Sequence, residues 1–124
     1  MVTDLARARG LGASHTGTEH WWTQRLTSLA LLPLSLWFIY SIVRLVGADY
    51  AMVKAWLSSP LSATLAIALV ILTFHHAASG MEVIFEDYIY CKCAKLTAII
   101  AIKFVSALGA IICILSVLKL ALGG

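Results

Sequence analysis

Three long, mainly apolar stretches limit this chain to a membrane-spanning fold. Between Arg25 and Arg44 lie 18 residues with no formal charge, LTSLALLPLSLWFIYSIV. No Asp, Glu, Lys or Arg occurs at 55–81, and a third apolar stretch at 96–122 is interrupted only by Lys103 and Lys119. A helix of about 20 apolar residues crosses the hydrocarbon core of a bilayer, which is about 30 Å thick. The pattern therefore predicts an all-α integral membrane protein with three transmembrane helices.

Prolines, turn residues and composition place the boundaries of these helices. Ser59 and Pro60 are typical of an N-cap followed by proline in the first helical turn, and Pro33 is expected to bend the first span. A composition of 61% hydrophobic and 12% charged residues is that of a membrane domain, not a soluble one. We expect a polar N-terminal arm at 1–20 and one membrane domain at 21–124, with helices at about 22–47, 58–87 and 94–122 and a loop, GADYAMVKAW, after the first.

The basic residues argue against one class of partner and orient the chain. The formal net charge is only +3, and the nine Lys and Arg are scattered between the spans. Without a basic stripe, a nucleic-acid partner is excluded. Three spans put the two termini on opposite sides of the membrane. Five Lys and Arg residues lie on the side of the N-terminus and three on the other side. By the positive-inside rule, the N-terminus is expected on the cytoplasmic or matrix side.

Two adjacent histidines stand inside the second span. At about 100° per residue, His76 and Asp87 share one face of a continuous helix, about 16 Å apart along its axis, with Gly80 between them. His75 points about 100° away, so at most one of the two can be an axial ligand of a given iron. A neutral imidazole at this depth is either a haem ligand or a hydrogen-bonding group between helices. A bis-histidine haem site would need its second ligand from another helix. Because His15 and His20 lie in the polar arm, we expect that ligand from a partner subunit.

The segment after the histidines carries a family resemblance. HAASGMEVIFEDY, from His76 to Tyr88, resembles the H-A-x-x-G-M-x-V-x-x-x-D-Y stretch of the small hydrophobic membrane anchor (cytochrome b small subunit) of succinate dehydrogenase, which is respiratory complex II. The three spans, the polar arm and Arg25 at the start of the first span agree with it, and the EDY form resembles the alphaproteobacterial and mitochondrial branch. The resemblance implies half of a heterodimeric haem-binding helix bundle in a bacterial inner (cytoplasmic) or mitochondrial inner membrane.

Specific roles are implied by the same resemblance. His76 would be an axial ligand of haem b, with the other ligand from a second membrane anchor. Arg25 would lie near the haem propionates. Tyr88 would donate a hydrogen bond to a carbonyl oxygen of ubiquinone, with Asp87 beside it on the proton-delivery side. A phenol can donate to a quinone oxygen, and a guanidinium matches a propionate in bidentate geometry.

The resemblance also implies a multi-pass, non-catalytic subunit of an enzyme complex. This succinate:ubiquinone oxidoreductase belongs to the tricarboxylic acid cycle and the respiratory chain. Electrons from succinate would pass from flavin in the flavoprotein, through the clusters of the iron–sulfur protein, to ubiquinone. The chain would anchor both of these partners in membrane lipid. No role follows for His75, Lys103, Cys91 or Cys93; the two cysteines are too close for an ordinary disulfide and form only half of a four-ligand zinc site.

Two other functions are compatible with the residues. A small homo-oligomeric proton or ion channel could line its pore with His75 and His76, which would titrate near neutral pH. It would hold no pigment. A haem-free structural membrane protein could use the same histidines only to join helices. Replacing His76 would then alter the stability of the complex and no haem spectrum.

Overall fold

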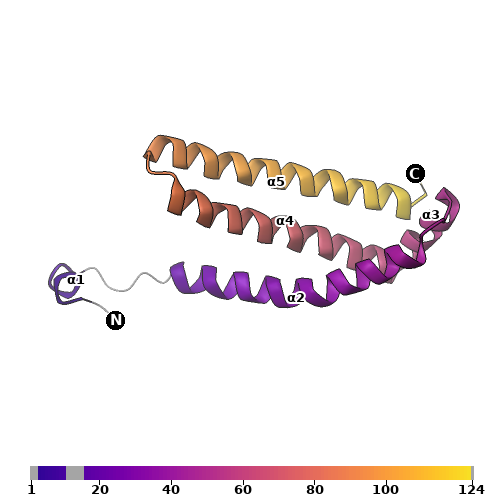
Figure 1. The fold of residues 1–124 in the computed structure, drawn as a ribbon, viewed down its shortest axis with the longest axis horizontal. Coiled ribbons are helices and arrows are strands. Elements are labelled where there is room, and N and C mark those ends of the chain that lie inside the picture. The colour runs from indigo at the N-terminus through magenta and orange to yellow at the C-terminus, as the bar shows by residue number, and fades with distance from the viewer. Residues whose placement is uncertain (1–2, 11–15, 124) are drawn as a thin grey trace.

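The structure is a computed structural model that describes residues 3–10 and 16–123. Its described part is helical and contains no strand (Figure 1). The helices are α1 (Asp4–Ala8), α2 (Thr16–Arg44), α3 (Tyr50–Ser58), α4 (Pro60–Tyr88) and α5 (Lys92–Ala121). Three segments are long and apolar enough to cross a membrane: Thr18–Arg44, Pro60–Tyr88 and Lys92–Ala121. The all-α fold with three spans is therefore confirmed.

The three long helices lie side by side in one layer, with α4 in the middle (Figure 1). α4 contacts α2 along one side and α5 along the other, and α3 contacts α4 and α5. The described backbones of α2 and α5 do not approach each other. The start of α2 and the connection between α4 and α5 lie at one end of the layer, and α3 lies at the other end (Figure 1).

The segment after the first span is a helix where the sequence predicted a loop. Asp49 caps it, since its carboxylate accepts a hydrogen bond of 2.9 Å from the backbone N–H of Met52. The ring of Trp56 stacks on Trp37 of α2 at 5.8 Å between centroids, which holds α3 against the end of α2. An apolar-span criterion overlooks such a short helix because it does not cross the membrane.

The observed helix ends differ from the expected ones by a few residues. α2 begins at Thr16, inside the expected polar arm, and ends at Arg44. The carboxylate of Glu19 lies in the first turn of α2, where its negative charge interacts favourably with the positive end of the helix dipole. α2 runs unbroken through Pro33, and its C-terminal half curves toward α3 (Figure 1).

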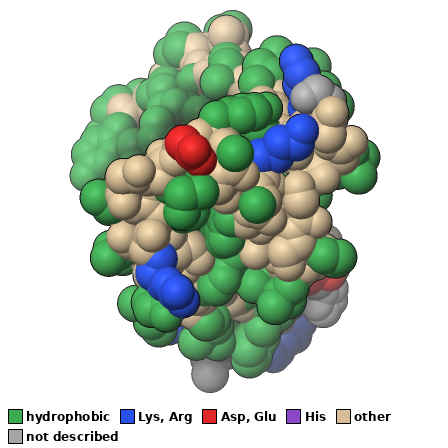
Figure 2. Space-filling view, turned by 90° about the vertical axis from the view of Figure 1, so that its right-hand side faces the viewer, with side chains coloured by type: hydrophobic (Ala, Val, Ile, Leu, Met, Phe, Trp, Pro, Cys, Tyr) green, Lys and Arg blue, Asp and Glu red, His purple; other side chains and the backbone are tan. Residues whose placement is uncertain are grey.

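Burial in this chain is the reverse of that in a soluble protein. Among the described residues, only Leu57 and Ala66 are buried hydrophobic side chains, at 5% and 8% exposure, while Thr27, Ser41 and Ser79 are buried polar ones. Figure 2, which views the end of the molecule near α3, shows mainly hydrophobic and uncharged surface with few charged groups. Small polar residues between helices and apolar residues outside are characteristic of membrane bundles.

One glycine of α5 lies directly against an aromatic side chain of α4. A Cβ built at Gly109 would lie 2.7 Å from Phe74 Cε1 and 3.0 Å from Cζ. The ring of Phe74 on α4 therefore occupies the space that a side chain at this position of α5 would need. Gly109 and Phe74 therefore form a close contact between α5 and α4.

Candidate functional site

His76 lies at the contact between α4 and α2. Its Nδ1 is 3.2 Å from the hydroxyl oxygen of Thr27, which is only 8% exposed. Within the part of the chain that the structure describes, Nε2 of the same ring makes no hydrogen bond. The ring is half-buried. One nitrogen is thus held by a neighbouring helix, and the other is available to a group from outside this chain.

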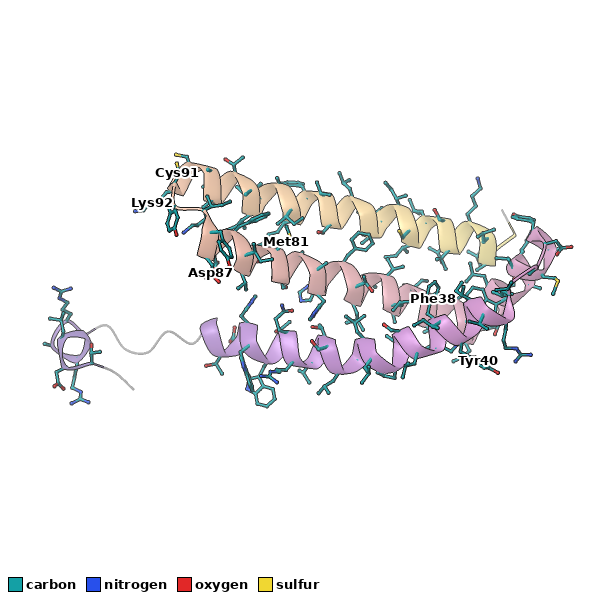
Figure 3. The ribbon with its side chains drawn as sticks, viewed as in Figure 1. Phe38, Tyr40, Met81, Asp87, Cys91 and Lys92 are labelled. Atoms are coloured by element: carbon teal, nitrogen blue, oxygen red, sulfur yellow. The ribbon has the colours of Figure 1, made fainter. Side chains whose placement is uncertain are left out.

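The far end of α4 carries the acid and the phenol that the sequence singled out. α4 continues without interruption from His76 to Tyr88, which meets the condition for placing His76 and Asp87 on one face. Figure 3 shows Asp87 at the end of α4, near Cys91 and Lys92, where α5 begins. Asp87 is exposed, Tyr88 is 75% exposed, and neither side chain makes a hydrogen bond or ion pair with another described residue. Both groups are therefore accessible to a ligand or partner.

Arg25 lies on a different face of α2 from Thr27. Its guanidinium carbon is 4.9 Å from the centroid of the Trp21 ring, and the side chain is exposed. Two residues along a helix correspond to about 200°, so Arg25 faces away from α4 while Thr27 contacts it. Within this chain, the structure does not bring Arg25 beside His76.

His75 faces an open groove of about 600 Å³ between α2, α4 and α5. The groove is also lined by Glu82 and by Lys103 of α5, whose charged atoms are 3.5 Å apart. The two adjacent histidines of α4 therefore have different surroundings: His75 lines the groove, and His76 contacts α2. No sequence pattern indicated the ion pair, because its partners lie on different helices.

The environment of the connection lowers one thiol pKa. Cys91 is exposed and caps α5, and backbone N–H groups of Ala94 and then Cys93 lower its pKa below the ordinary value of 9.0. Hydrogen bonds from a helix N-terminus stabilise the thiolate. Across the described residues, no group of three or more His, Cys, Asp or Glu side chains forms a metal cluster.

Comparison with known proteins identifies the family. Residues 1–117 match the family of succinate dehydrogenase/fumarate reductase transmembrane subunits. The chain belongs to this family. Among its relatives are proteins named succinate dehydrogenase hydrophobic membrane anchor subunit from three bacteria. The Rickettsia bellii (strain RML369-C) protein is 33% identical over 105 residues, which cover 85% of this chain and 84% of that protein.

Two further relatives carry the same name. The Rickettsia conorii (strain ATCC VR-613 / Malish 7) protein is 30% identical over 101 residues, covering 81% of this chain and 80% of the relative. The Paracoccus denitrificans protein is 27% identical over 103 residues, covering 83% and 80%. The resemblance found in the sequence is confirmed at the level of the succinate dehydrogenase/fumarate reductase family, and a multi-pass membrane anchor agrees with the three spans.

The residues present fit the haem that this succinate dehydrogenase/fumarate reductase family member was expected to hold. A single imidazole nitrogen is sufficient as the contribution of one chain to a six-coordinate haem, and Nε2 of His76 has no partner among the described residues. At Gly80, one turn further along α4, an added Cβ would meet nothing within 4 Å, so the backbone there is open to a flat group. The buried Oε1 of Gln24, near Thr27 on α2, also has no partner within the described chain. Buried acceptors normally find a donor, which indicates a neighbour from outside the described residues.

Proposed function

We propose that this chain is the small membrane anchor of a succinate:ubiquinone oxidoreductase. It would attach the flavoprotein and iron–sulfur subunits to the membrane. With a second membrane anchor, it would form a haem b site and part of a ubiquinone site. The observation that carries the proposal is His76, which is held through Nδ1 by α2 and keeps Nε2 free on an α4 face that continues to Asp87. Family membership supports the same role.

In the proposed haem site, this chain contributes one ligand and one open face. Nε2 of His76 would bind the iron, and the absence of a side chain at Gly80 lets the macrocycle approach α4. The second membrane anchor would supply the other axial ligand. Arg25 would bind a propionate, for which its guanidinium has to turn away from Trp21 toward the edge of the haem. Bound haem would supply a one-electron redox centre within the membrane.

The proposed quinone site uses the exposed end of α4. The phenol of Tyr88 would donate a hydrogen bond to a carbonyl oxygen of ubiquinone and orient the ring. Asp87, exposed beside it, would accept protons from water and pass them toward the quinone oxygens. Reduction of ubiquinone takes two electrons and two protons, so the site must reach water on one side. The catalytic chemistry belongs to the cofactors of the partner proteins, and this chain positions and protonates the substrate.

The proposed assembly follows from the arrangement of the layer. Asp87, Tyr88 and the start of α2 lie at the same end (Figures 1 and 3). We place this end on the cytoplasmic or matrix side of a bacterial or mitochondrial inner membrane, where the flavoprotein and iron–sulfur subunits would dock. The exposed apolar sides of the layer would contact the second membrane anchor and membrane lipid.

An optical difference spectrum of the solubilised complex tests the ligand assignment. We expect a b-type signal in the reduced-minus-oxidised spectrum of the wild type and of His75→Ala, and its loss or conversion to high spin in His76→Ala. An unchanged spectrum in His76→Ala would overturn the assignment. A complex without haem that still co-purifies with a flavoprotein would support the haem-free structural role. Absence of both would favour the channel.

A conservative change at the end of α4 tests the quinone site. Tyr88→Phe removes one hydrogen-bond donor, and a neutral hydrogen bond contributes about 0.5–1.5 kcal/mol. We therefore expect kcat/KM for ubiquinone to fall about 2- to 10-fold, while the haem spectrum stays as in the wild type. Tyr90→Phe, two residues beyond α4, is the matched control and should retain the wild-type rate. Equal rates in wild type and Tyr88→Phe would contradict the role of the phenol.

A further inference from the structure

We propose that Thr27 is a positioning residue that fixes the tautomer and the ring orientation of His76. The inference rests on the proposed function, in which His76 binds haem iron, and specifies how α2 prepares that ligand. Its basis is the hydrogen bond between the Thr27 hydroxyl and His76 Nδ1, which joins two helices at a buried position.

The hydroxyl of Thr27 has one proton and three polar neighbours. Its oxygen is 2.8 Å from the backbone oxygen of Thr23, 3.0 Å from that of Gln24 and 3.2 Å from Nδ1 of His76. Carbonyl oxygens can only accept, and both are closer to the hydroxyl than Nδ1 is, so we infer that the hydroxyl proton points at the backbone oxygens of α2. The hydroxyl therefore presents a lone pair to His76.

A lone pair facing Nδ1 determines where the imidazole carries its proton. In a neutral ring one nitrogen is a donor and the other an acceptor. Since Thr27 can only accept from His76 here, Nδ1 carries the proton and Nε2 keeps its lone pair. Nε2 is then the nitrogen that binds iron, and the hydroxyl selects the tautomer before any haem is present.

The same contact also restricts the rotation of the ring. Thr27 is β-branched and its hydroxyl is bonded to its own helix, so the acceptor has a fixed position on α2. Thr27 is buried between α2 and α4, which excludes water as a competing partner. The ring of His76 is thereby held with Nε2 directed away from Thr27. Ligating histidines commonly donate their second N–H to such an acceptor, which increases their basicity toward the metal.

Potentiometric titration of the haem in the intact complex tests the role of the hydroxyl. Thr27→Val keeps the shape of the side chain and removes the acceptor, which makes His76 a weaker donor to iron. The ferric state loses stabilisation, so we expect the midpoint potential to shift to a more positive value and the low-spin electron paramagnetic resonance signal to broaden. Thr27→Ser keeps the hydroxyl and should retain the wild-type potential and signal.

A second threonine of α2 provides the matched control. Thr23 bonds to its own helix through the backbone oxygen of Glu19 and makes no hydrogen bond to a histidine within the described residues. Thr23→Val should therefore leave the haem potential unchanged. If Thr27→Val does not assemble, Thr27→Ala is compared with Thr27→Ser by the same criteria. Loss of haem per flavin in an assembled Thr27→Val complex, with retention in Thr27→Ser, also supports the proposal.

The outcomes separate this inference from the proposed function. A wild-type potential in Thr27→Val, or equal shifts in Thr27→Val and Thr27→Ser, overturns the role of the hydroxyl while the haem assignment stands. A wild-type complex without a b-type spectrum, or a spectrum that survives His76→Ala, overturns the ligand assignment and the inference together.

Discussion

Replacing Gly109 by alanine measures how tightly α4 and α5 pack. The added Cβ would lie 2.7 Å from Phe74 Cε1, whereas ordinary van der Waals contact begins at 3.4 Å. The edge of the ring must therefore move by about 0.7 Å, against an attraction that is optimal near 3.5–4.0 Å. Overpacking of this kind destabilises a protein by about 1–3 kcal/mol. We expect a loss of this size from the steric contact alone.

Gly80→Ala on α4 is the matched control, since its added Cβ would meet nothing within 4 Å. Both exchanges gain the preference of helices for alanine over glycine, which is about 1 kcal/mol. The difference between the two free energies of unfolding therefore isolates the clash. We expect Gly109→Ala to be less stable than Gly80→Ala by about 1–3 kcal/mol.

Titration of the micelle-bound chain with SDS, followed by the circular dichroism of its helices, gives these free energies. A double-variant cycle with Phe74→Leu identifies the partner, because leucine removes the ring edge that the new methyl group meets. Gly109→Ala should cost less in the Phe74→Leu background than in the wild type. Equal stability of the two alanine variants, or equal costs in both backgrounds, would refute the reasoning.

Three other predictions concern the Cys91 thiol, the Glu82–Lys103 ion pair and the Asp49 cap. Because the Cys91 pKa is lowered, its alkylation by iodoacetamide, measured in Cys93→Ser, should reach half its maximal rate below pH 9.0, and a midpoint at or above that pH would contradict the helix-terminus effect. Glu82→Gln and Lys103→Gln should each cost up to about 1 kcal/mol in unfolding free energy, and the double variant less than the sum; strict additivity would show that the pair does not interact. Asp49→Ala should destabilise the chain by about 1 kcal/mol through loss of the α3 cap. Asp49→Asn, measured by the same titration, should retain most of the wild-type stability.

The spans and the faces of single helices could be predicted from the sequence because they depend on local patterns. Long apolar runs indicated the three spans, and a constant step of about 100° placed His76 and Asp87 on one face once α4 proved continuous. The contact of His76 with Thr27 could not be predicted, because it depends on how α2 is rotated against α4. The exposure of Arg25 could not be predicted for the same reason. α3 carried a local signal in Asp49, but a short helix lying outside the apolar spans leaves no span-length pattern.

The central place of α4 has a consequence for how the sequence can vary. A new side chain on α4 must fit against α2 on one side, against α5 on the other, and against any protein that docks on the layer. α2 and α5 each have only one long neighbour within the described chain. In a systematic substitution scan, α4 should therefore tolerate the fewest replacements. The outer sides of α2 and α5 should exchange Leu, Ile, Val and Ala freely, since each of these side chains suits a lipid surface equally well.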